Sequence, residues 1–315
     1  MSVKIFFGKQ TAEGVVTYST PEGISTQLEK SVLSYANNML DLGATDFSGG
    51  ETYNSTKSET FNSLQAEGDQ FLIGIETKFD TPIEWNSKTL EAILPSLGYA
   101  KVGADTFYKM TSDEPAWYTV VVSDTLNNKT TVYKDCKVNS LSINAAKGAL
   151  VNGSLSWIGK TAEFEAGIVT ESASTNRGDS LVAIDSVIKI GGSPVTTDVE
   201  SVAIEINNNL EAKGSIDSLY TKKIRRSAPQ ATSVKLEFNS YDQARFEATK
   251  AKAIANTNEN LELTLKDGAK TIVIAIPKLF IATSDRGDYK GAGTHSLSMT
   301  ASVNNADNTP AKFTF

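Results

Sequence analysis

The chain contains one cysteine and one histidine, the residue types that could combine in nucleophilic catalysis. Cys136 lies in an alternating segment, residues 132–138, that predicts a strand, and His295 follows a Gly-Ala-Gly-Thr sequence typical of a turn. A thiol nucleophile needs a base close to it, and these two residues fall in different halves of the chain. We expect Cys136 to be a small packed side chain and His295 to be a loop residue. A metal site built from Cys and His ligands needs more such residues than the chain has.

Paired carboxylates are the second candidate for chemistry. Glu163 and Glu165 alternate along a predicted strand, which is the pattern of a solvated strand face. Two carboxylates are enough for glycoside hydrolysis, so an enzyme stays open as an alternative. The chain lacks both the Gly-x-Gly-x-x-Gly and the Gly-x-x-x-x-Gly-Lys-Ser/Thr motifs of nucleotide sites. We therefore expect a protein that is not an enzyme and has no catalytic residues, cofactor or metal.

Charge is divided unequally along the chain. Residues 1–180 contain 22 Asp and Glu and 14 Lys and Arg, a net charge of −8, whereas residues 181–315 contain 15 and 16, a net charge of +1. An acidic protein repels DNA phosphates. This argues against specific DNA binding and is compatible with double-stranded DNA that passes without adhering. No run of about 18 apolar residues is present, so we expect no membrane partner.

Five cations lie close together within residues 210–231, a segment that we predict to be a loop inserted between two strands. They are Lys213, Lys222, Lys223, Arg225 and Arg226. One hypothesis is that this loop contacts the acidic half of another copy of the chain. A solvated basic loop is the alternative. A nucleic-acid patch has little support, since Tyr220 is the only aromatic residue nearby.

The elements that must carry these residues are mostly strands. Apolar residues alternate with polar ones over most of the chain, between turn residues, which indicates antiparallel strands with one buried face. Two short helices interrupt the pattern. The first is capped by Asn86 or Ser87 and limited by Pro95 and Gly98, and the second covers residues 241–255 behind Ser240 or Asp242.

Several strand features can be placed more closely. Residues 184–190 and 199–206 predict a hairpin, and Asp267-Gly268 predicts a second one. Pro277 is expected to end or bulge its strand. The three tryptophans, Trp85, Trp117 and Trp157, occupy strand positions that read as core.

The two halves repeat each other. Residues 83–87 read Ile-Glu-Trp-Asn-Ser and residues 236–240 read Leu-Glu-Phe-Asn-Ser; near the end of each copy stand Leu-Ser-Trp at 155–157 and Leu-Ser-Met at 297–299. Each copy has the order strand, short helix, hairpin, hairpin. We predict a mainly β protein of two tandem β-sandwich or open-barrel modules, each with one short helix.

Two segments stand outside this repeat. Residues 19–68 are too long for an ordinary loop; they form an arm over neighbouring subunits, an elaborated sheet edge or a floppy extension. Residues 171–180 lack large apolar anchors and are the best linker candidate. The predicted division is therefore residues 1–180, an N-terminal arm with the first module, and residues 181–315, the second module with its inserted loop at 210–231.

One long segment resembles a known family. Residues 133–160 read YKDCKVNSLSINAAKGALVNGSLSWIGK, and residues 188–193 and 199–209 read IKIGGS and VESVAIEINNN. These strand patterns are similar to those of the tail tube proteins, also called major tail proteins, of long-tailed phages in their two-module form. The resemblance covers about residues 70–315.

The resemblance implies a structural virion protein without enzymatic activity. It implies trimeric rings with pseudo-sixfold symmetry that stack helically into the tube of a flexible, non-contractile (siphovirus) tail and conduct the genome during ejection. The implied partners are other copies of the chain, a tape-measure protein in the lumen, the tail terminator and distal tail proteins, and passing DNA. The implied location is the virion tail, assembled in the host cytoplasm. A carbohydrate-binding adhesin or a head decoration protein is the alternative.

Overall fold

The computed structural model describes residues 3–20, 23–24, 39–57, 70–109, 115–167, 179–195, 198–268, 270–287, 293–304 and 309–315. Residues 171–178, most of the predicted linker, and much of the predicted arm (21–22, 25–38 and 58–69) lie outside the described residues. The part of the arm that is described is extended: β2 (Val15–Thr20) pairs with β1 (Val3–Ala12), and β5 (Ser48–Lys57) pairs with β6 (Gln70–Glu84). That stretch is thus part of the sheets.

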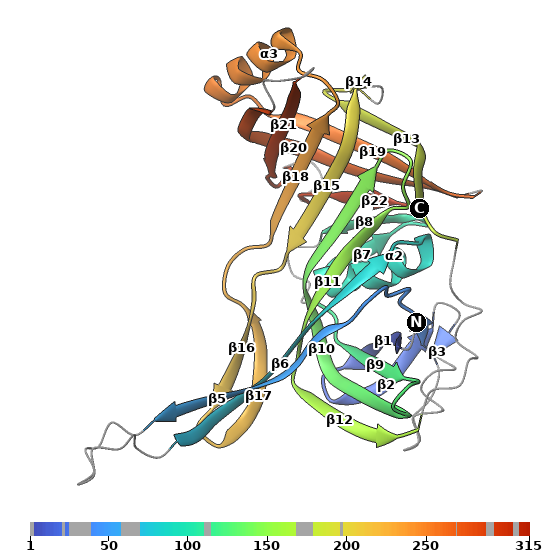
Figure 1. Ribbon diagram of the computed structural model, residues 1–315, viewed down its shortest axis with the longest axis vertical. Coiled ribbons are helices and arrows are strands. Elements are labelled where there is room, and N and C mark those ends of the chain that lie inside the picture. Colours follow the sequence, from blue (N-terminus) through green and yellow to red (C-terminus); the bar gives the residue numbers. More distant parts are fainter. Residues whose placement is uncertain are drawn as a thin grey trace.

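One large antiparallel sheet runs through both halves of the chain (Figure 1). Its neighbouring strands run in the order β5, β6, β11, β10, β15, β18, β21, β20, β19, β13, and the hairpin β7–β8 joins β20 through β22. The strands not yet given bounds are β7 (Tyr99–Val102), β8 (Thr106–Lys109), β10 (Lys129–Ala146), β11 (Asn152–Gly159), β13 (Val182–Ile190), β15 (Val199–Asn207), β18 (Ala231–Phe238), β19 (Glu259–Asp267), β20 (Lys270–Gly287), β21 (Thr294–Ala301) and β22 (Lys312–Thr314).

A second sheet covers the first half. It consists of β4 (Leu40–Asp41), β1, β9 (Tyr118–Asp124), the first half of β10 and β12 (Thr161–Ala166). Residues 129–136 of β10 pair in this sheet and residues 137–146 pair in the large sheet. Because one strand belongs to both sheets, it fixes their relative position over a shared core.

The two halves have the same strand pairings. β1 pairs with β9 as β13 pairs with β19, and β5 pairs with β6 as β15 pairs with β18. The triplet β6, β11, β10 likewise corresponds to β18, β21, β20. Both β10 and β20 have 18 residues, and each has a hairpin partner on either end, β9 and β11 or β19 and β21. The repeat in the sequence is therefore also a repeat in topology.

The two sequence matches behind the repeat differ in register by two residues. Leu155 lies opposite Thr81, whereas its counterpart Leu297 lies opposite Leu236. Ile83, which the first match aligns with Leu236, lies opposite Gly153. A shift of two residues keeps every side chain on the same face of the sheet. The modules thus tolerate the shift without turning a core residue outward.

The core is one continuous cluster that includes residues from both modules. Trp85 and Trp157 are fully buried within it, as predicted, but Trp117 is only partly buried. The Nζ of Lys137 lies 4.0 Å from the centroid of the Trp117 ring, and that of Lys160 lies 5.2 Å away. Trp117 packs at the margin of a small second cluster of Ile158, Leu210 and Ile224, and its ring also contacts two cations.

The two helices begin where the sequence predicts. In α2 (Ser87–Ile93) Asn86 is the N-cap and accepts a hydrogen bond from the Thr89 amide at 2.8 Å. The 3₁₀ turn Leu94–Leu97 follows, and Gly98 ends it with φ of 78°. In α3 (Gln243–Ile254) Asp242 is the N-cap and accepts from the amides of Ala244 and Arg245. No helix among the described residues is long and apolar enough to cross a membrane.

Two predictions about strand connections are wrong. β13 and β15 do not form a hairpin, since β13 pairs with β14 (Ser193–Pro194) and β19, and β15 pairs with β10 and β18. The predicted loop at 210–231 is largely a β-hairpin of β16 (Leu210–Ser215) and β17 (Ser218–Arg226). The hairpin is predicted because β13 and β15 are close in sequence. The strands within residues 210–231 are missed because that segment has few apolar residues to show an alternating pattern.

The two remaining turn predictions are confirmed. Asp267 pairs with Lys270 across a tight turn in which Gly268 has φ of +54°. At Pro277 the strand β20 continues but its pairing with β19 shifts register, since Leu261 faces Ile276 and Glu259 faces Leu279. Proline has no amide hydrogen to give to a ladder, so a bulge is the expected outcome.

Candidate assembly surfaces

The two modules of the chain are joined by direct strand pairing. Residues 140–146 of β10 pair antiparallel with residues 201–207 of β15, from Ser140 opposite Asn207 to Ala146 opposite Ser201. On its other side this half of β10 pairs with β11. The joint thus pairs β10, the longest strand of the first module, with β15, the strand of the second module that corresponds to β5.

Each partner of this joint has a counterpart with an open edge. Within the described residues, β5 pairs only with β6, and residues 282–287 of β20 pair only with β21. β5 corresponds to β15, and β20 corresponds to β10. Unpaired strand edges expose a row of backbone donors and acceptors to any chain that can pair with them. The molecule therefore has the two halves of a joint that it already makes once internally, one on β5 at an end of the large sheet and the other on the second half of β20.

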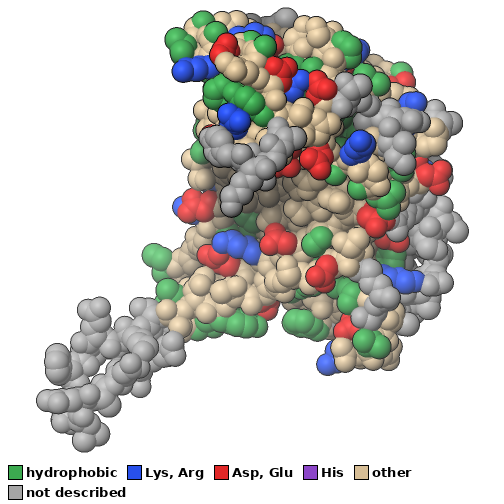
Figure 2. Space-filling view, turned by 45° about the horizontal axis from the view of Figure 1, so that its top comes forward, with side chains coloured by type: hydrophobic (Ala, Val, Ile, Leu, Met, Phe, Trp, Pro, Cys, Tyr) green, Lys and Arg blue, Asp and Glu red, His purple; other side chains and the backbone are tan. Residues whose placement is uncertain are grey.

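The β5–β6 and β16–β17 hairpins project together from the molecule and form a second surface, which we call the projecting arm (Figure 1). β5 and β6 extend outward, the β16–β17 hairpin runs beside them, and Tyr220 of β17 bridges Ile75 of β6. A groove between the two hairpins is lined by residues of both. Several large apolar side chains are exposed there: Ile216, Ile73 and Tyr53 by 110%, 58% and 62%, together with Leu72, Leu219 and Tyr220. Figure 2 shows hydrophobic side chains along the lower margin of the molecule near this arm.

The hairpin divides the five predicted contact cations between its two faces. Lys213 faces Lys223 across the strands and Glu211 faces Arg225, so these side chains share one face. Lys222 and Arg226 lie on the other face, with the buried Ile224. Lys222, Lys223, Arg225 and Lys213 are exposed, and Lys213 makes an ion pair with Glu211 at 2.6 Å.

Arg226 differs from the other four because it is half buried at the base of the hairpin. Its guanidinium donates to Asn208 Oδ1 at 3.1 Å. The amide of Asn208 in turn donates to the carbonyl oxygens of Ser96 at 3.1 Å and Val138 at 2.8 Å. Gln230 also donates to Asn208 Oδ1, at 2.8 Å. This network holds the hairpin base against the first module, which gives Arg226 a structural role within the chain.

The cysteine and the histidine that could have done chemistry are both buried and engaged in packing. Cys136 is fully buried in β10, and burial raises the pKa of its thiol well above the ordinary value. The prediction that His295 is a loop residue is wrong. It lies fully buried in β21, where its Nε2 is 2.9 Å from Ser284 Oγ. Its ring stacks on Phe238 at 5.3 Å, and burial lowers its pKa.

Of the two β12 carboxylates, Glu163 forms a surface ion pair. Glu163 is about half exposed and pairs with Lys134 of the neighbouring β10 at 2.6 Å; the side chain of Glu165 lies outside the described residues. Among the described residues no group of three or more His, Cys, Asp or Glu side chains could hold a metal ion. The features that stand out are therefore strand edges and exposed hairpins.

These features describe a mainly β protein with open strand edges and exposed hairpins among its described residues. The family described as phage tail tube protein matches residues 2–312, nearly the whole chain. The chain belongs to this family of structural tail proteins. No curated protein matches the chain. Sequence reasoning reached the family but could not say which strands lie at open edges, because that depends on tertiary pairing.

Proposed function

We propose that the chain polymerises through its strand edges into stacked rings that form the phage tail tube and conduct the genome during ejection. One observation carries the proposal: the chain makes the β10–β15 joint once internally and has the matching strands, β20 and β5, with open edges. A joint between β20 of one chain and β5 of the next repeats the same contact. Such a head-to-tail contact closes a ring when its rotation closes, and otherwise builds a filament.

The finer picture follows from the two modules in each chain. Three chains supply six similar modules, which gives a trimeric ring with pseudo-sixfold symmetry. The flexible, non-contractile tail of a siphovirus, assembled in the host cytoplasm, is the expected setting. Expected partners are a tape-measure protein in the lumen and the terminator and distal proteins at the tube ends. The acidic first module, with its net charge of −8 over residues 1–180, favours passage of DNA without adhesion.

The projecting arm is the proposed contact between rings. Its hairpins expose apolar side chains and a group of cations, while the first module carries the excess of acidic residues. An exposed apolar patch on a soluble protein marks an interaction surface. We assign Lys213, Lys223 and Arg225 to the ring-to-ring contact, with Lys222 on the opposite face and Arg226 at the base.

Negative-stain microscopy of the purified protein tests the proposal. We expect rings and tubes with a central channel. Blocking the strand edges should raise the protein concentration that is needed for assembly. A protein that stays monomeric at high concentration, and instead binds glycans or capsid shells, would overturn the tail-tube assignment of function in favour of an adhesin or decoration protein.

A further inference from the structure

The two helices occupy corresponding places in the two modules but have different surroundings. In α2 the side chains of Ser87, Thr89, Leu90 and Ile93 are all buried. In the longer α3 only Thr249 is buried, and Ile254 is 77% exposed. Figure 1 shows α3 at the outer end of the second module, whereas α2 lies beside strands of the first module and near its junction with the second.

The burial of α2 depends in part on the second module. The backbone amide and Oγ of Ser87 both donate to Asp267 Oδ2, and the amide donates over 3.3 Å. Asp267 belongs to the β19–β20 turn of the second module. Next to it, the Leu181 amide donates to the carbonyl oxygen of Trp85 at 2.8 Å, just before β13 begins. The corner between β6 and α2 is thus docked against one turn and one strand start.

The first module has a corresponding turn and strand start, and no helix corner of the described residues covers them. The counterpart of the β19–β20 turn is the β9–β10 turn, which is two residues longer, since Asp124 pairs with Lys129 whereas Asp267 pairs with Lys270. The Asp124 carboxylate accepts hydrogen bonds from Leu126 and Asn127 within its own turn. The counterpart of the start of β13 is the start of β1, where Val3 pairs with Asp124. Asp267 is only 7% exposed, but the β9–β10 turn is open, with Leu126 80% exposed.

A groove lies beside this turn. It has a volume of about 740 Å³, and its lining combines the apolar Val3, Phe47, Val122 and Phe164 with polar residues that include Asp124. Phe164 is 75% exposed. Apolar walls next to an unfilled turn are what a helix corner from another molecule would cover.

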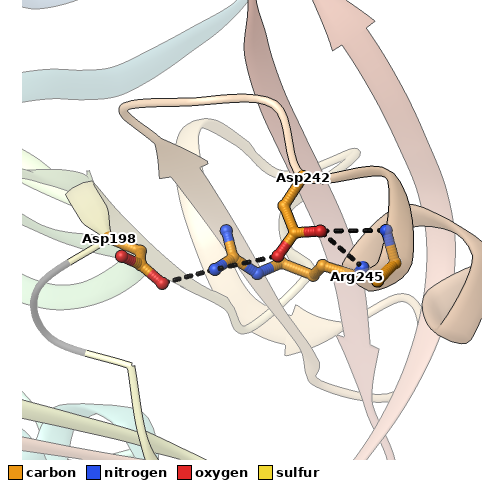
Figure 3. A network of polar contacts seen from close by, with 4 residues as sticks. Asp198, Asp242 and Arg245 are labelled. Atoms are coloured by element: carbon orange, nitrogen blue, oxygen red, sulfur yellow. Dashed lines mark hydrogen bonds and ion pairs between the residues drawn. The ribbon is translucent and has the colours of Figure 1, made fainter.

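The corner that could fill it is already rigid. Asp242 caps α3 and lies within 4.0 Å of the Arg245 guanidinium, which also forms an ion pair with Asp198 just before β15 (Figure 3). The guanidinium of Arg245 lies 4.3 Å from the centroid of the Phe238 ring. Phe246 packs edge-on against His295 at 5.7 Å. These contacts fix the direction of α3 while leaving its outer surface open.

We propose that the β18–α3 corner of one chain, residues 239–243, docks on the β9–β10 turn and the start of β1 of the next chain. The contact repeats, between chains, the one that the β6–α2 corner makes with the β19–β20 turn within the chain. It has the same direction as the proposed β20–β5 joint, since both place the second module of one copy against the first module of the next. The inference rests on the proposed function and adds a second, separate contact to it.

Crosslinking between exposed cysteines tests the contact, in a Cys136→Ser background and with a short bismaleimide. Leu126→Cys supplies the turn. Ser240→Cys, the sequence counterpart of Ser87, and Gln243→Cys, the first residue of α3, supply the corner in two separate double variants. We expect assembled protein of at least one double variant to give a ladder of covalent multimers on denaturing gels. Leu126→Cys combined with Lys88→Cys is the matched control, because the corner at α2 is already occupied within its own chain.

The unmodified protein gives a second measurement that needs no variant. On assembly, amide hydrogen exchange should slow by roughly tenfold or more at residues 239–255 and 124–128. Exchange in α2 should change little, because it is docked before assembly. Tubes without the ladder and without this protection would overturn the α3 contact and leave the tail-tube function standing. A wild-type chain that never assembles would overturn both.

Discussion

At the residue scale, the tightest constraint lies where Gly153 passes under Trp85. A Cβ at residue 153 would stand 1.9 Å from the carbonyl oxygen of Ser142 and 2.5 Å from Trp85 Nε1. Trp85 Nε1 donates to that same carbonyl oxygen at 2.9 Å. The strand pair β10–β11 can therefore approach the indole only because residue 153 has no side chain.

We predict that Gly153→Ala lowers the free energy of unfolding by about 3 kcal/mol, because it overpacks a rigid backbone contact and displaces a buried hydrogen bond. Urea denaturation followed by tryptophan fluorescence measures the change. Gly214→Ala is the matched control, since a Cβ there meets nothing within 4 Å and its backbone is not in the left-handed region. Equal stability of the two variants would refute this account of the Trp85 site.

His295 makes the second module sensitive to pH. Burial lowers its pKa below the value of an exposed histidine, so the folded protein holds it neutral. Above the unfolded pKa of about 6.5 both states are neutral and the residue adds no pH dependence. As the pH falls below that value, the unfolded state takes up a proton that the folded state resists, and stability declines.

The expected result is a loss of thermal stability between pH 7 and pH 5 that is smaller in His295→Gln than in the wild type. Thermal unfolding followed by circular dichroism across this range compares the two proteins. Other groups also titrate in this range. The test therefore compares the slope of melting temperature against pH in the wild type with the slope in the variant. Parallel slopes would mean that His295 does not contribute.

At the scale of elements, the β16–β17 hairpin shows why pairing matters more than composition. The five cations are neighbours in sequence, but strand geometry sends Lys213, Lys223 and Arg225 to one face and Lys222 and Arg226 to the other. Arg226 also anchors the hairpin base through Asn208. A test that reverses all the charges at once would therefore mix a contact surface with a structural support.

We predict that Lys213→Glu, Lys223→Glu and Arg225→Glu together impair tube formation, because exposed opposite charges between rings would become repulsive. Sedimentation and microscopy at several salt concentrations measure the effect, and added salt should weaken it. The single variants Lys223→Glu and Lys222→Glu form a matched pair on opposite faces, with the larger effect expected for Lys223. Normal tubes from the triple variant at physiological salt would remove this surface from the ring contact.

At the scale of the whole molecule, the chain resembles a segment cut from a longer repeating sheet. Within the chain, the joint between modules is reinforced by the β8–β22 pairing, with Phe313 buried and edge-on to Tyr99 at 5.3 Å. The second module has no equivalent of the β7–β8 hairpin, because only residues 255–258 separate α3 from β19. The joint between chains is therefore expected to be weaker than the joint within a chain.

Proline in β5 tests the edge pairing directly. Successive amides of an edge strand point alternately toward its partner and toward the open side. Of Thr52→Pro and Tyr53→Pro, one should break a bond to β6 and lower stability; the other should leave a folded monomer that no longer assembles. Circular dichroism and analytical ultracentrifugation separate the two outcomes. If both variants fold and assemble as the wild type does, the open edge of β5 is not part of the tube.

The sequence by itself determined the mainly β class, the tight turn at Asp267 and Gly268 and the family, and it narrowed each helix cap to two residues, because each of these depends on local patterning. Repetition of Ile-Glu-Trp-Asn-Ser as Leu-Glu-Phe-Asn-Ser also gave the two modules their order along the chain.

Only the tertiary structure decided which strands pair, that His295 is buried, that residues 210–226 form a hairpin and that β5 and β20 lie at open edges. Strand pairing joins residues far apart in sequence, and the alternation that predicts a strand is the same at the centre of a sheet as at its edge. The difference between α2 and α3 likewise appears only when their neighbours are known. Each helix has its cap in the local sequence, but burial depends on what the rest of the chain places against it.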